Sequence, residues 1–227
     1  MLLILQMNRQ IIPTQDGSHT IAIPELQVTY HSTFGAVQES KHVYIEAGLI
    51  PLLQSHSRIH ILEVGFGTGL NALLSLGETE KAGNMIVYTA IEPFPLTKDE
   101  AQALNYCDQL LHPDWRFYFL QMHTCEWEKE EYITQRFSIY KTKTSLQAYS
   151  LMQQQQLIFF DAFAPAAQPE LWDKAVFEQL YKMMQPGGIL VTYCSKGSVR
   201  RTMQSAGFTI EKLPGPPGKR EMIRALK

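Results

Sequence analysis

The sequence has little cysteine, no long apolar run and almost no net charge, and each shortage excludes a class of protein. The three cysteines, Cys107, Cys125 and Cys194, are odd in number and include no CxxC pair or Cys/His cluster with zinc spacing. We therefore expect a reducing compartment, no disulfide scaffold and no metal. No stretch reaches the ~20 apolar residues of a membrane span, and the apolar run at residues 1–5 is too short for a signal peptide core. These absences predict a cytoplasmic protein that does not enter a membrane.

The charge is small overall but unevenly distributed along the chain. A formal net charge of −2 over 227 residues excludes a uniformly basic protein of the histone kind. Residues 196–227 nevertheless carry eight Lys or Arg and only two Glu, a net +6, which leaves −8 for the residues before them. A basic face on an acidic body fits the footprint of a polyanion-binding protein. A solvated surface with no partner is the alternative, and charge alone does not decide between them.

The order of expected elements predicts an α/β fold of the Rossmann-like kind. Hydrophobic residues make up 45% of the chain, enough for a sizeable core. Residues 1–56 suggest short strands and one helix, and we expect a small β-rich extension that packs on the core. From residue 57 strands and helices alternate, which predicts a mostly parallel, doubly wound sheet with a terminal antiparallel hairpin. We expect strands at 59–64, 86–91, 117–120, 157–160, 189–193, 208–213 and 222–226, and helices at 70–76, 97–105, 169–184 and 198–205. Residues 126–150 fit this alternation poorly, and we interpret them as an insertion.

A glycine-rich turn between the first strand and helix of this domain is the sharpest local signal. The sequence from Glu63 to Asn71 reads EVGFGTGLN. Glycines there let the backbone turn sharply and approach a ligand, with the N–H groups of the helix directed at it. The dinucleotide fingerprint is GxGxxG, whereas here the third glycine comes one residue early. The GxGxG form after an acidic residue is typical of methyltransferases that use S-adenosylmethionine (SAM).

Two carboxylates follow later strands. Glu92 ends the second strand, 23 residues after Gly69, where a nucleoside cofactor needs an acceptor for its ribose hydroxyls. Asp161 directly follows the apolar strand at 157–160, and ligands of open α/β sheets bind outside the carboxyl ends of the strands. A solvent-facing loop acid for Glu92, and helix capping or loop bracing for Asp161, are the alternative interpretations.

Several longer motifs resemble the methyltransferase domain of the MnmC family. They are EVGFGTGLN at 63–71, IEPFPLT at 91–97, DAFAPAAQPELW at 161–172, PGG at 186–188, SVRR at 198–201, QSAGF at 204–208 and PGKREM at 217–222. The resemblance runs in order from about residue 16 to the C-terminus. It implies that residues 57–227 form a SAM-dependent methyltransferase domain.

The resemblance also implies a substrate and an activity. Members transfer a methyl group from SAM to the exocyclic amine of 5-aminomethyl-(2-thio)uridine at the tRNA wobble position, which gives the 5-methylaminomethyl form. Bifunctional members add a flavin-dependent domain that first removes a carboxymethyl group. Because the printed chain ends at Lys227, just after the methyltransferase strands, we expect a stand-alone methyltransferase that binds no flavin.

Matching motif positions provide the candidate site residues. We expect Asp161 to be catalytic, by orienting the amine and accepting its proton. The candidate cofactor-binding residues are Glu63, Gly65, Phe66, Gly67, Thr68, Gly69, Asn71, Glu92, Pro93, His123 and Asp161. The candidate tRNA-binding residues are Phe163, Lys196, Arg200, Arg201, Lys219 and Arg220. His123 is a departure from the family, since bifunctional relatives have Gly-Asp after the third strand where this chain has Met122-His123. A neutral His can accept a hydrogen bond from the adenine amine and a protonated one cannot.

Three other functions remain open at this point. An aminopropyltransferase of the spermidine synthase kind would share the fold and use decarboxylated SAM, but the basic tail argues against polyamine substrates. A non-catalytic SAM-fold RNA-binding module would not need intact Gly65, Gly67, Gly69, Glu92 and Asp161. A nicotinamide-dependent dehydrogenase is disfavoured by the spacing of the glycines.

Overall fold

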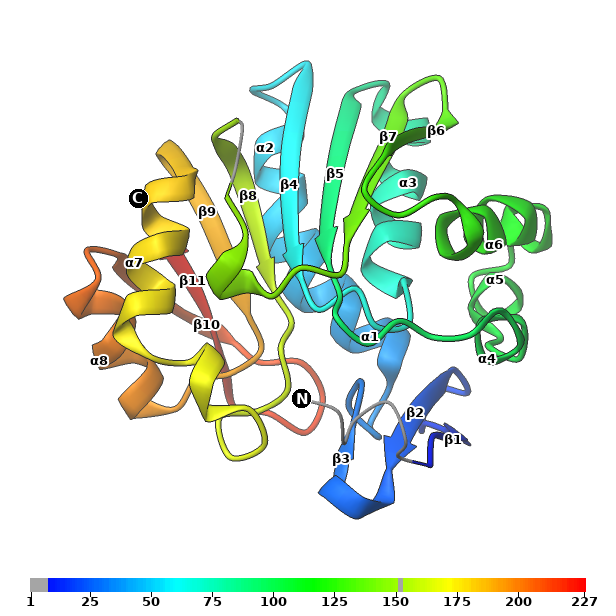
Figure 1. Cartoon of the computed structure of the whole chain (residues 1–227), viewed down its shortest axis with the longest axis horizontal. Coiled ribbons are helices and arrows are strands. Elements are labelled where there is room, and N and C mark those ends of the chain that lie inside the picture. Colours follow the sequence, from blue (N-terminus) through cyan, green and yellow to red (C-terminus); the bar gives the residue numbers. More distant parts are fainter. Residues whose placement is uncertain (1–7, 151–152) are drawn as a thin grey trace.

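The computed structural model describes residues 8–150 and 153–227, so the apolar run at residues 1–5 lies outside the described residues. Within that part of the chain, two sheets are present: a small antiparallel one in the order β1-β2-β3 and a main one in the order β10-β11-β9-β8-β4-β5-β7-β6 (Figure 1). The strands are β1 (Gln10–Pro13), β2 (His19–Ile23), β3 (Val28–Thr29), β4 (Arg58–Val64), β5 (Met85–Ile91), β6 (Glu130–Thr134), β7 (Phe137–Thr142), β8 (Gln155–Phe160), β9 (Met184–Thr192), β10 (Thr209–Pro214) and β11 (Glu221–Leu226). Strands β4, β5, β7, β8 and β9 are parallel, and β10 and β11 form the expected antiparallel hairpin.

The helices cover both faces of the main sheet. They are α1 (Ala36–Ser40), the π-helical segment η3 (Lys41–Leu49), α2 (Ile50–Leu53), α3 (Leu70–Ala82), α4 (Lys98–Gln102), α5 (Tyr106–Gln109), α6 (Arg116–Thr124), α7 (Lys174–Met183) and α8 (Gly197–Ser205). Short 3-10 turns are η2 (Pro24–Leu26), η4 (Pro113–Trp115), η5 (Leu146–Ala148) and η6 (Pro169–Leu171). No helix among the described residues is long and apolar enough to cross a bilayer.

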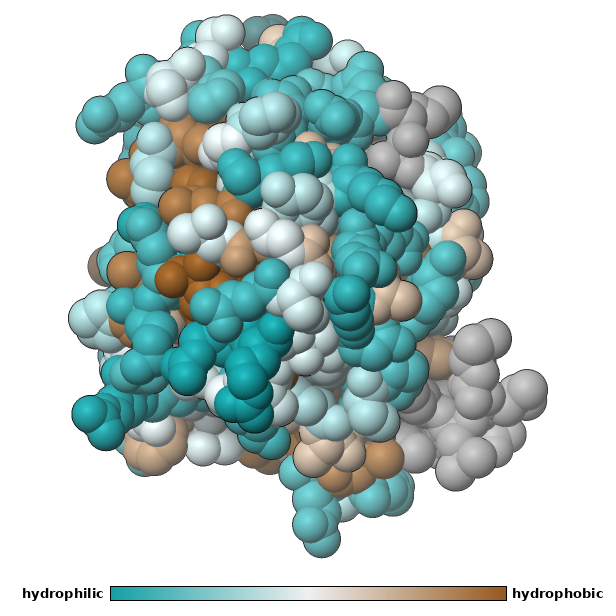
Figure 2. Space-filling view, turned by 90° about the vertical axis from the view of Figure 1, so that its left-hand side faces the viewer, coloured by the Kyte–Doolittle hydropathy of each residue, from teal (hydrophilic) through white to brown (hydrophobic). Residues whose placement is uncertain are grey.

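Alternation along the parallel strands explains why the sheet is buried on both faces. On β4, Ile59 and Ile61 belong to the hydrophobic cluster that includes η3 and α3, whereas Leu62 and Val64 belong to the cluster of α7 and α8. Successive strand residues point to opposite faces, so a continuously apolar strand supplies both clusters. Figure 2 shows the side of the molecule with α7 and α8, where the outer surface is mostly hydrophilic.

The strand expected at 117–120 is wrong, because residues 116–124 form helix α6. The apolar residues there follow a helical period, with Phe119 and Met122 buried and Phe117 exposed. The third parallel strand is β7, which lies inside the segment interpreted as an insertion. Residues 126–150 are therefore part of the main sheet, where β6 pairs with β7 and β7 with β5.

Two helix predictions are confirmed with adjusted ends. Thr97 caps α4 in a capping box with Glu100. The helix expected at 169–184 begins later, because Asp173 caps α7 by accepting a hydrogen bond from the Val176 N–H, and η6 precedes it.

The N-terminal extension lies beside the carboxyl edge of the main sheet. Figure 1 shows the small sheet β1–β3 beyond the ends of β4 and β5, and Ile21 and Val43 share one hydrophobic cluster with β4. The division of the chain at residue 56 remains a prediction.

Candidate active site

A cavity of about 350 Å³ opens at the carboxyl edge of the sheet. It lies at the switch point of the topology, where β5 flanks β4 on one side and β8 on the other, and ligands of such sheets bind there. Its walls come from the loops that follow β4, β5, β7 and β8, and from Tyr30 and His31 of the N-terminal extension. This volume suits a small-molecule ligand.

The glycine-rich turn forms the floor of the cavity. Gly65 has a φ of +91°, and a Cβ at this position would lie 2.6 Å from the backbone oxygen of Asp161. Only glycine combines this left-handed backbone with such a close approach. Phe66, Gly67 and Thr68 line the cavity, and α3 begins at Leu70, directly after the turn.

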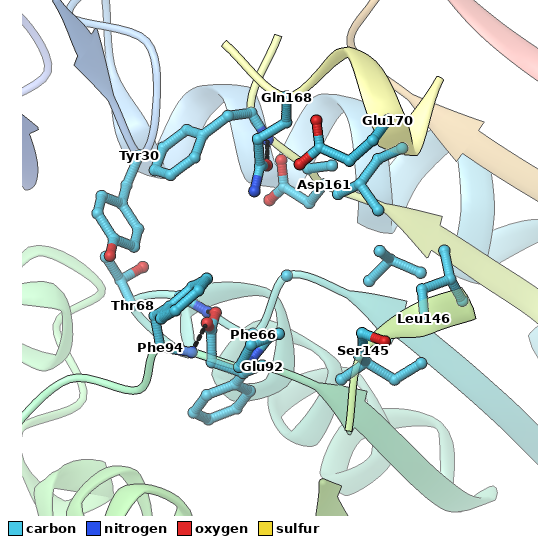
Figure 3. Close-up of a pocket in the computed structure, with 18 of the residues that line it drawn as sticks. Tyr30, Phe66, Thr68, Glu92, Phe94, Ser145, Leu146, Asp161, Gln168 and Glu170 are labelled. Carbon is cyan, nitrogen blue, oxygen red and sulfur yellow. Dashed lines mark hydrogen bonds between the residues drawn. The ribbon is translucent and has the colours of Figure 1, made fainter. Parts of the chain in front are cut away.

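Glu92 lies against this turn, as expected from the sequence. Its two carboxylate oxygens accept hydrogen bonds from the backbone N–H groups of Gly67 (2.9 Å) and Phe94 (2.8 Å). The side chain lines the cavity together with Pro93 and Phe94 (Figure 3). Burial raises the pKa of Glu92, and the two backbone hydrogen bonds oppose that rise. Each oxygen retains a further lone pair for a ligand donor.

Asp161 lies on the opposite wall of the cavity from Glu92 (Figure 3). Its Oδ1 accepts a hydrogen bond from the Tyr44 hydroxyl (2.6 Å), and its Oδ2 accepts one from Asn71 Nδ2 (2.9 Å). Burial is the main reason that the pKa of Asp161 rises to about 7, while the hydrogen bonds from Tyr44 and Asn71 lower it. A carboxylate with a pKa near neutrality is suited to exchange protons with a ligand.

Glu63 and Asn71 lie behind Asp161 and do not line the cavity. Asn71 Nδ2 donates to Glu63 Oε1 (2.9 Å) as well as to Asp161, so the amide links the two carboxyl groups. Glu63 is fully buried, and burial raises its pKa well above the usual range. In the structure these two residues support Asp161, and their contacts with the cofactor stay a prediction.

His123 also lies outside the cavity lining, and its expected contact with the adenine stays a prediction. That expectation depended on a strand at 117–120, whereas His123 is on helix α6. Its Nε2 lies 3.1 Å from the Thr68 carbonyl, and its ring packs against Phe66 and Phe119. Burial lowers the pKa of His123 to about 4, so the ring is neutral and its Nε2–H donates to that carbonyl. His123 thus braces the glycine-rich turn from behind, close to Gly69.

Several cavity residues are not among the candidate site residues expected from the sequence. Tyr30 and His31 come from the extension, and His31 Nε2 lies 2.7 Å from Thr68 Oγ1. Ser145, Leu146 and Gln147 follow β7 and occupy the place beyond the third strand that the sequence suggests for His123. Gln168 and Glu170 complete the wall that contains Asp161 (Figure 3).

The predicted tRNA-binding residues divide into one aromatic residue, four cations without an ion pair, and Lys219. Phe163 lines the cavity, edge-on to Tyr30 at 5.1 Å between ring centroids. Four cations make no ion pair with any described residue. They are Lys196 in the loop after β9, Arg200 and Arg201 in α8, and Arg220 just before β11. Strand β11 runs antiparallel to β9, so the end of β9 and the start of β11, which Lys196 and Arg220 adjoin, lie at the cavity edge of the sheet.

Lys219 differs from these four cations because it is already paired within the protein, and its contact with a phosphate stays a prediction. Its ammonium pairs with the buried Glu39 carboxylate and lies 3.9 Å from the centre of the Tyr193 ring. The Tyr193 hydroxyl donates in turn to the Ala162 carbonyl, next to Asp161. Lys219 therefore joins the C-terminal hairpin to the extension.

Comparison with known proteins identifies the family to which this chain belongs. The profile of a family described as S-adenosyl-L-methionine-dependent methyltransferase matches residues 104–227, more than half of the chain. The chain belongs to this methyltransferase family. It is a SAM-dependent methyltransferase, and its cofactor is SAM.

Relatives named as MnmC match over most of this chain. The "tRNA 5-methylaminomethyl-2-thiouridine biosynthesis bifunctional protein MnmC" of Chromobacterium violaceum is 30% identical over 228 residues, which cover 92% of this chain and 33% of that protein. The protein of the same name from Leptospira interrogans is 32% identical and covers 86% of this chain and 32% of its own length. This chain thus spans about a third of the length of these relatives.

Two solved structures share the fold. MnmC2 from Aquifex aeolicus superimposes with a TM-score of 0.81 at 24% identity, covering 97% of this chain and 70% of that one. Spermidine synthase from Thermotoga maritima gives a TM-score of 0.50 at 12% identity, covering 98% of this chain and 74% of that one. At these identities the matches establish the Rossmann-like architecture and nothing finer.

Proposed function

We propose that this methyltransferase transfers the methyl group of SAM to the exocyclic amine of 5-aminomethyl-(2-thio)uridine at the wobble position of tRNA, which gives the 5-methylaminomethyl form. The names of the relatives support this substrate. The observation that carries the proposal is Asp161, a carboxylate on the cavity wall with a pKa of about 7. No Lys or Arg lines the cavity within the described residues, while Glu92, Asp161 and Glu170 do, and such walls favour a cationic substrate.

The residues of the cavity fit SAM. The close approach at Gly65 seats the glycine-rich turn on the backbone of Asp161, so that Phe66, Gly67 and Thr68 line the cavity. The free lone pairs of Glu92 suit ribose hydroxyls. We assign Gly65, Phe66, Gly67, Thr68, Glu92 and Pro93 to the cofactor. Bound SAM supplies a methyl group on a sulfonium.

The role of the protein in this reaction is to align the amine and remove a proton. The substrate amine must present a lone pair, so an ammonium must lose one proton before the new N–C bond forms and the S–C bond breaks. Asp161 accepts that proton as a general base. Holding the reacting groups in line can contribute up to about 7–11 kcal/mol.

Replacing Glu92 with Ala should weaken SAM binding. Loss of charge-assisted hydrogen bonds costs about 1.5–3 kcal/mol, or roughly 10- to 150-fold in affinity. Calorimetry with SAM and with S-adenosylhomocysteine measures the change. The control is Glu80→Ala, an exposed acid on α3. Wild-type affinity in a folded Glu92→Ala protein would remove Glu92 from the cofactor site.

We propose further that Phe163 stacks on an extruded base and that the four unpaired cations meet tRNA phosphates. Arg200→Ala/Arg201→Ala should flatten the slope of log affinity against log salt concentration by about 0.7–0.9 for each phosphate that the variant no longer neutralises. A filter-binding titration at several salt concentrations gives the slope. The matched control is Arg58→Ala/Lys182→Ala, which also removes two exposed cations. Arg58 begins β4 and therefore lies at the edge of the sheet opposite the cavity. Equal slopes in both double variants would leave the α8 charges as a solvated surface.

The function is tested by incubating the protein with SAM and tRNA that carries aminomethyluridine, followed by mass spectrometry of the nucleosides. We expect the nucleoside to gain one methyl group. Parallel incubations contain tRNA with the carboxymethylaminomethyl form, or decarboxylated SAM with a diamine. If product forms only in the incubation with decarboxylated SAM and the diamine, the protein is an aminopropyltransferase. The acidic side chains of the cavity are the observation that favours this alternative, since a diamine is cationic.

A further inference from the structure

The N-terminal extension contributes a buried side chain to the carboxylate of Asp161. The Tyr44 hydroxyl donates to Asp161 Oδ1 at 2.6 Å, and the Tyr44 side chain is fully buried. Its ring packs on Phe159 with 5.3 Å between the centroids. Tyr44 does not line the cavity, so its hydroxyl reaches the carboxylate from behind, on the side away from a ligand.

The helix that carries Tyr44 is held firmly on the sheet. Tyr44 belongs to the nine-residue π-helical segment η3, and π-helical turns are rare and frequent at functional sites. Within η3, a Cβ at Gly48 would lie 3.0 Å from Val191 and 3.3 Å from Phe159. The glycine thus permits a close approach of η3 to β8 and β9, which fixes the distance between Tyr44 and Asp161.

The groups around Asp161 come from every element packed against it. The anionic or acidic groups are Glu39 on α1, Glu63 on β4, and Glu92 and Glu170 on the cavity walls; the cation is Lys219 before β11. Burial raises the pKa values of Tyr44, Tyr88 and Tyr193, so these phenols stay neutral. The acids around Asp161 disfavour its charged form, and among the described residues Lys219 is the one cation that opposes them. Tyr44 and Asn71 are the two groups that favour the charged carboxylate by donating hydrogen bonds directly to it.

We propose that Tyr44 is a positioning residue that holds Asp161 in its ionised form and in one orientation, so that the N-terminal extension completes the active site. Tyr44 retains its own proton throughout. The proton that leaves the substrate ammonium moves to a lone pair of Asp161 that faces the cavity. The part of this inference that concerns catalysis rests on the proposed function.

The hydrogen bond can be tested without any substrate. Protein labelled with ¹³C at the aspartate carboxyl carbon is titrated by NMR, and Asp161→Asn identifies the resonance of Asp161. We expect its midpoint near 7 in the wild type and about one pH unit higher in Tyr44→Phe, because that variant has no donor to Oδ1. Tyr181→Phe, which removes a hydroxyl from partly buried Tyr181 on α7, is the control and should leave the midpoint unchanged.

An unchanged midpoint in a folded Tyr44→Phe protein would overturn the proposal. If that variant does not fold, 3-fluorotyrosine at position 44 preserves the shape and is a stronger donor. The midpoint of Asp161 should then move to lower pH, and no movement would overturn the proposal in the same way.

A kinetic measurement separates this inference from the proposed function. The acidic limb of kcat/KM for tRNA methylation should move to higher pH in Tyr44→Phe, with little change in SAM affinity, because Tyr44 lies outside the cavity. A shifted NMR midpoint with an unmoved kinetic limb would refute the catalytic role of the hydrogen bond. Absence of tRNA methylation in the wild type itself, with the NMR shift intact, would instead refute the proposed substrate.

Discussion

Asp161→Asn is expected to reduce the rate of methyl transfer by about 10²- to 10⁴-fold, the range that a positioned general base contributes. The amide has nearly the shape of the carboxylate but cannot take a proton from the substrate ammonium. Single-turnover kinetics with excess SAM measure the step. Because the pKa of Asp161 is about 7, wild-type activity should rise with pH through that value as the carboxylate forms, and this limb should be absent in the variant.

The neighbours of Asp161 determine how this experiment is controlled. Asn71 presents an NH₂ group to Oδ2, so an amide at position 161 can place donor against donor. Asp161→Ala avoids that conflict and leaves the Tyr44 hydroxyl without an acceptor. Calorimetry with SAM and thermal unfolding of both variants therefore accompany the kinetics. Wild-type turnover in either folded variant would show that Asp161 is not the base.

The parts of the site predictable from sequence are those in which one local motif determines both backbone and chemistry. The glycine-rich turn at Gly65 and the acids that end β5 and β8 fall into this class, and the topology brings Glu92 and Asp161 to one cavity. Parallel strands place their carboxyl ends at a common edge, so strand-end residues converge whatever their separation in sequence.

The parts that could not be predicted depend on tertiary contacts. Residues 117–120 are apolar and aromatic, and a short run of this kind fits a strand as well as a helix. The buried positions Phe119 and Met122 favour the helix once α6 has a surface to pack on. A strand at 117–120 would leave no place for β7 in the sheet and would put His123 at a strand end. Tyr44 and Lys219 lie 117 and 58 residues from Asp161 in sequence, and no local pattern links either to it.

The second large effect is expected from Gly65→Ala. The φ of +91° costs an L-residue with a Cβ about 1–2 kcal/mol. The added methyl group would also lie 2.6 Å from the Asp161 backbone oxygen, and overpacking of this kind costs about 1–3 kcal/mol. We expect the free energy of unfolding to fall by about 2–5 kcal/mol, the sum of the two ranges, together with SAM affinity and turnover.

Neither partner of that close approach can move freely. The Gly65 N–H donates to the Ile91 carbonyl and the Asp161 N–H to the Val64 carbonyl, each at 3.0 Å. Relief of the clash must therefore displace the strand ends that carry the two facing walls of the cavity. Gly187→Ala is the matched control, since Gly187 has a φ of +78° and a Cβ there meets no atom within 4 Å. Denaturant unfolding should show only the left-handed cost in Gly187→Ala, with SAM binding and turnover intact. Equal losses of stability in the two variants would mean that the backbone conformation alone, and not the packing of the glycine turn against Asp161, sets the requirement for glycine at position 65.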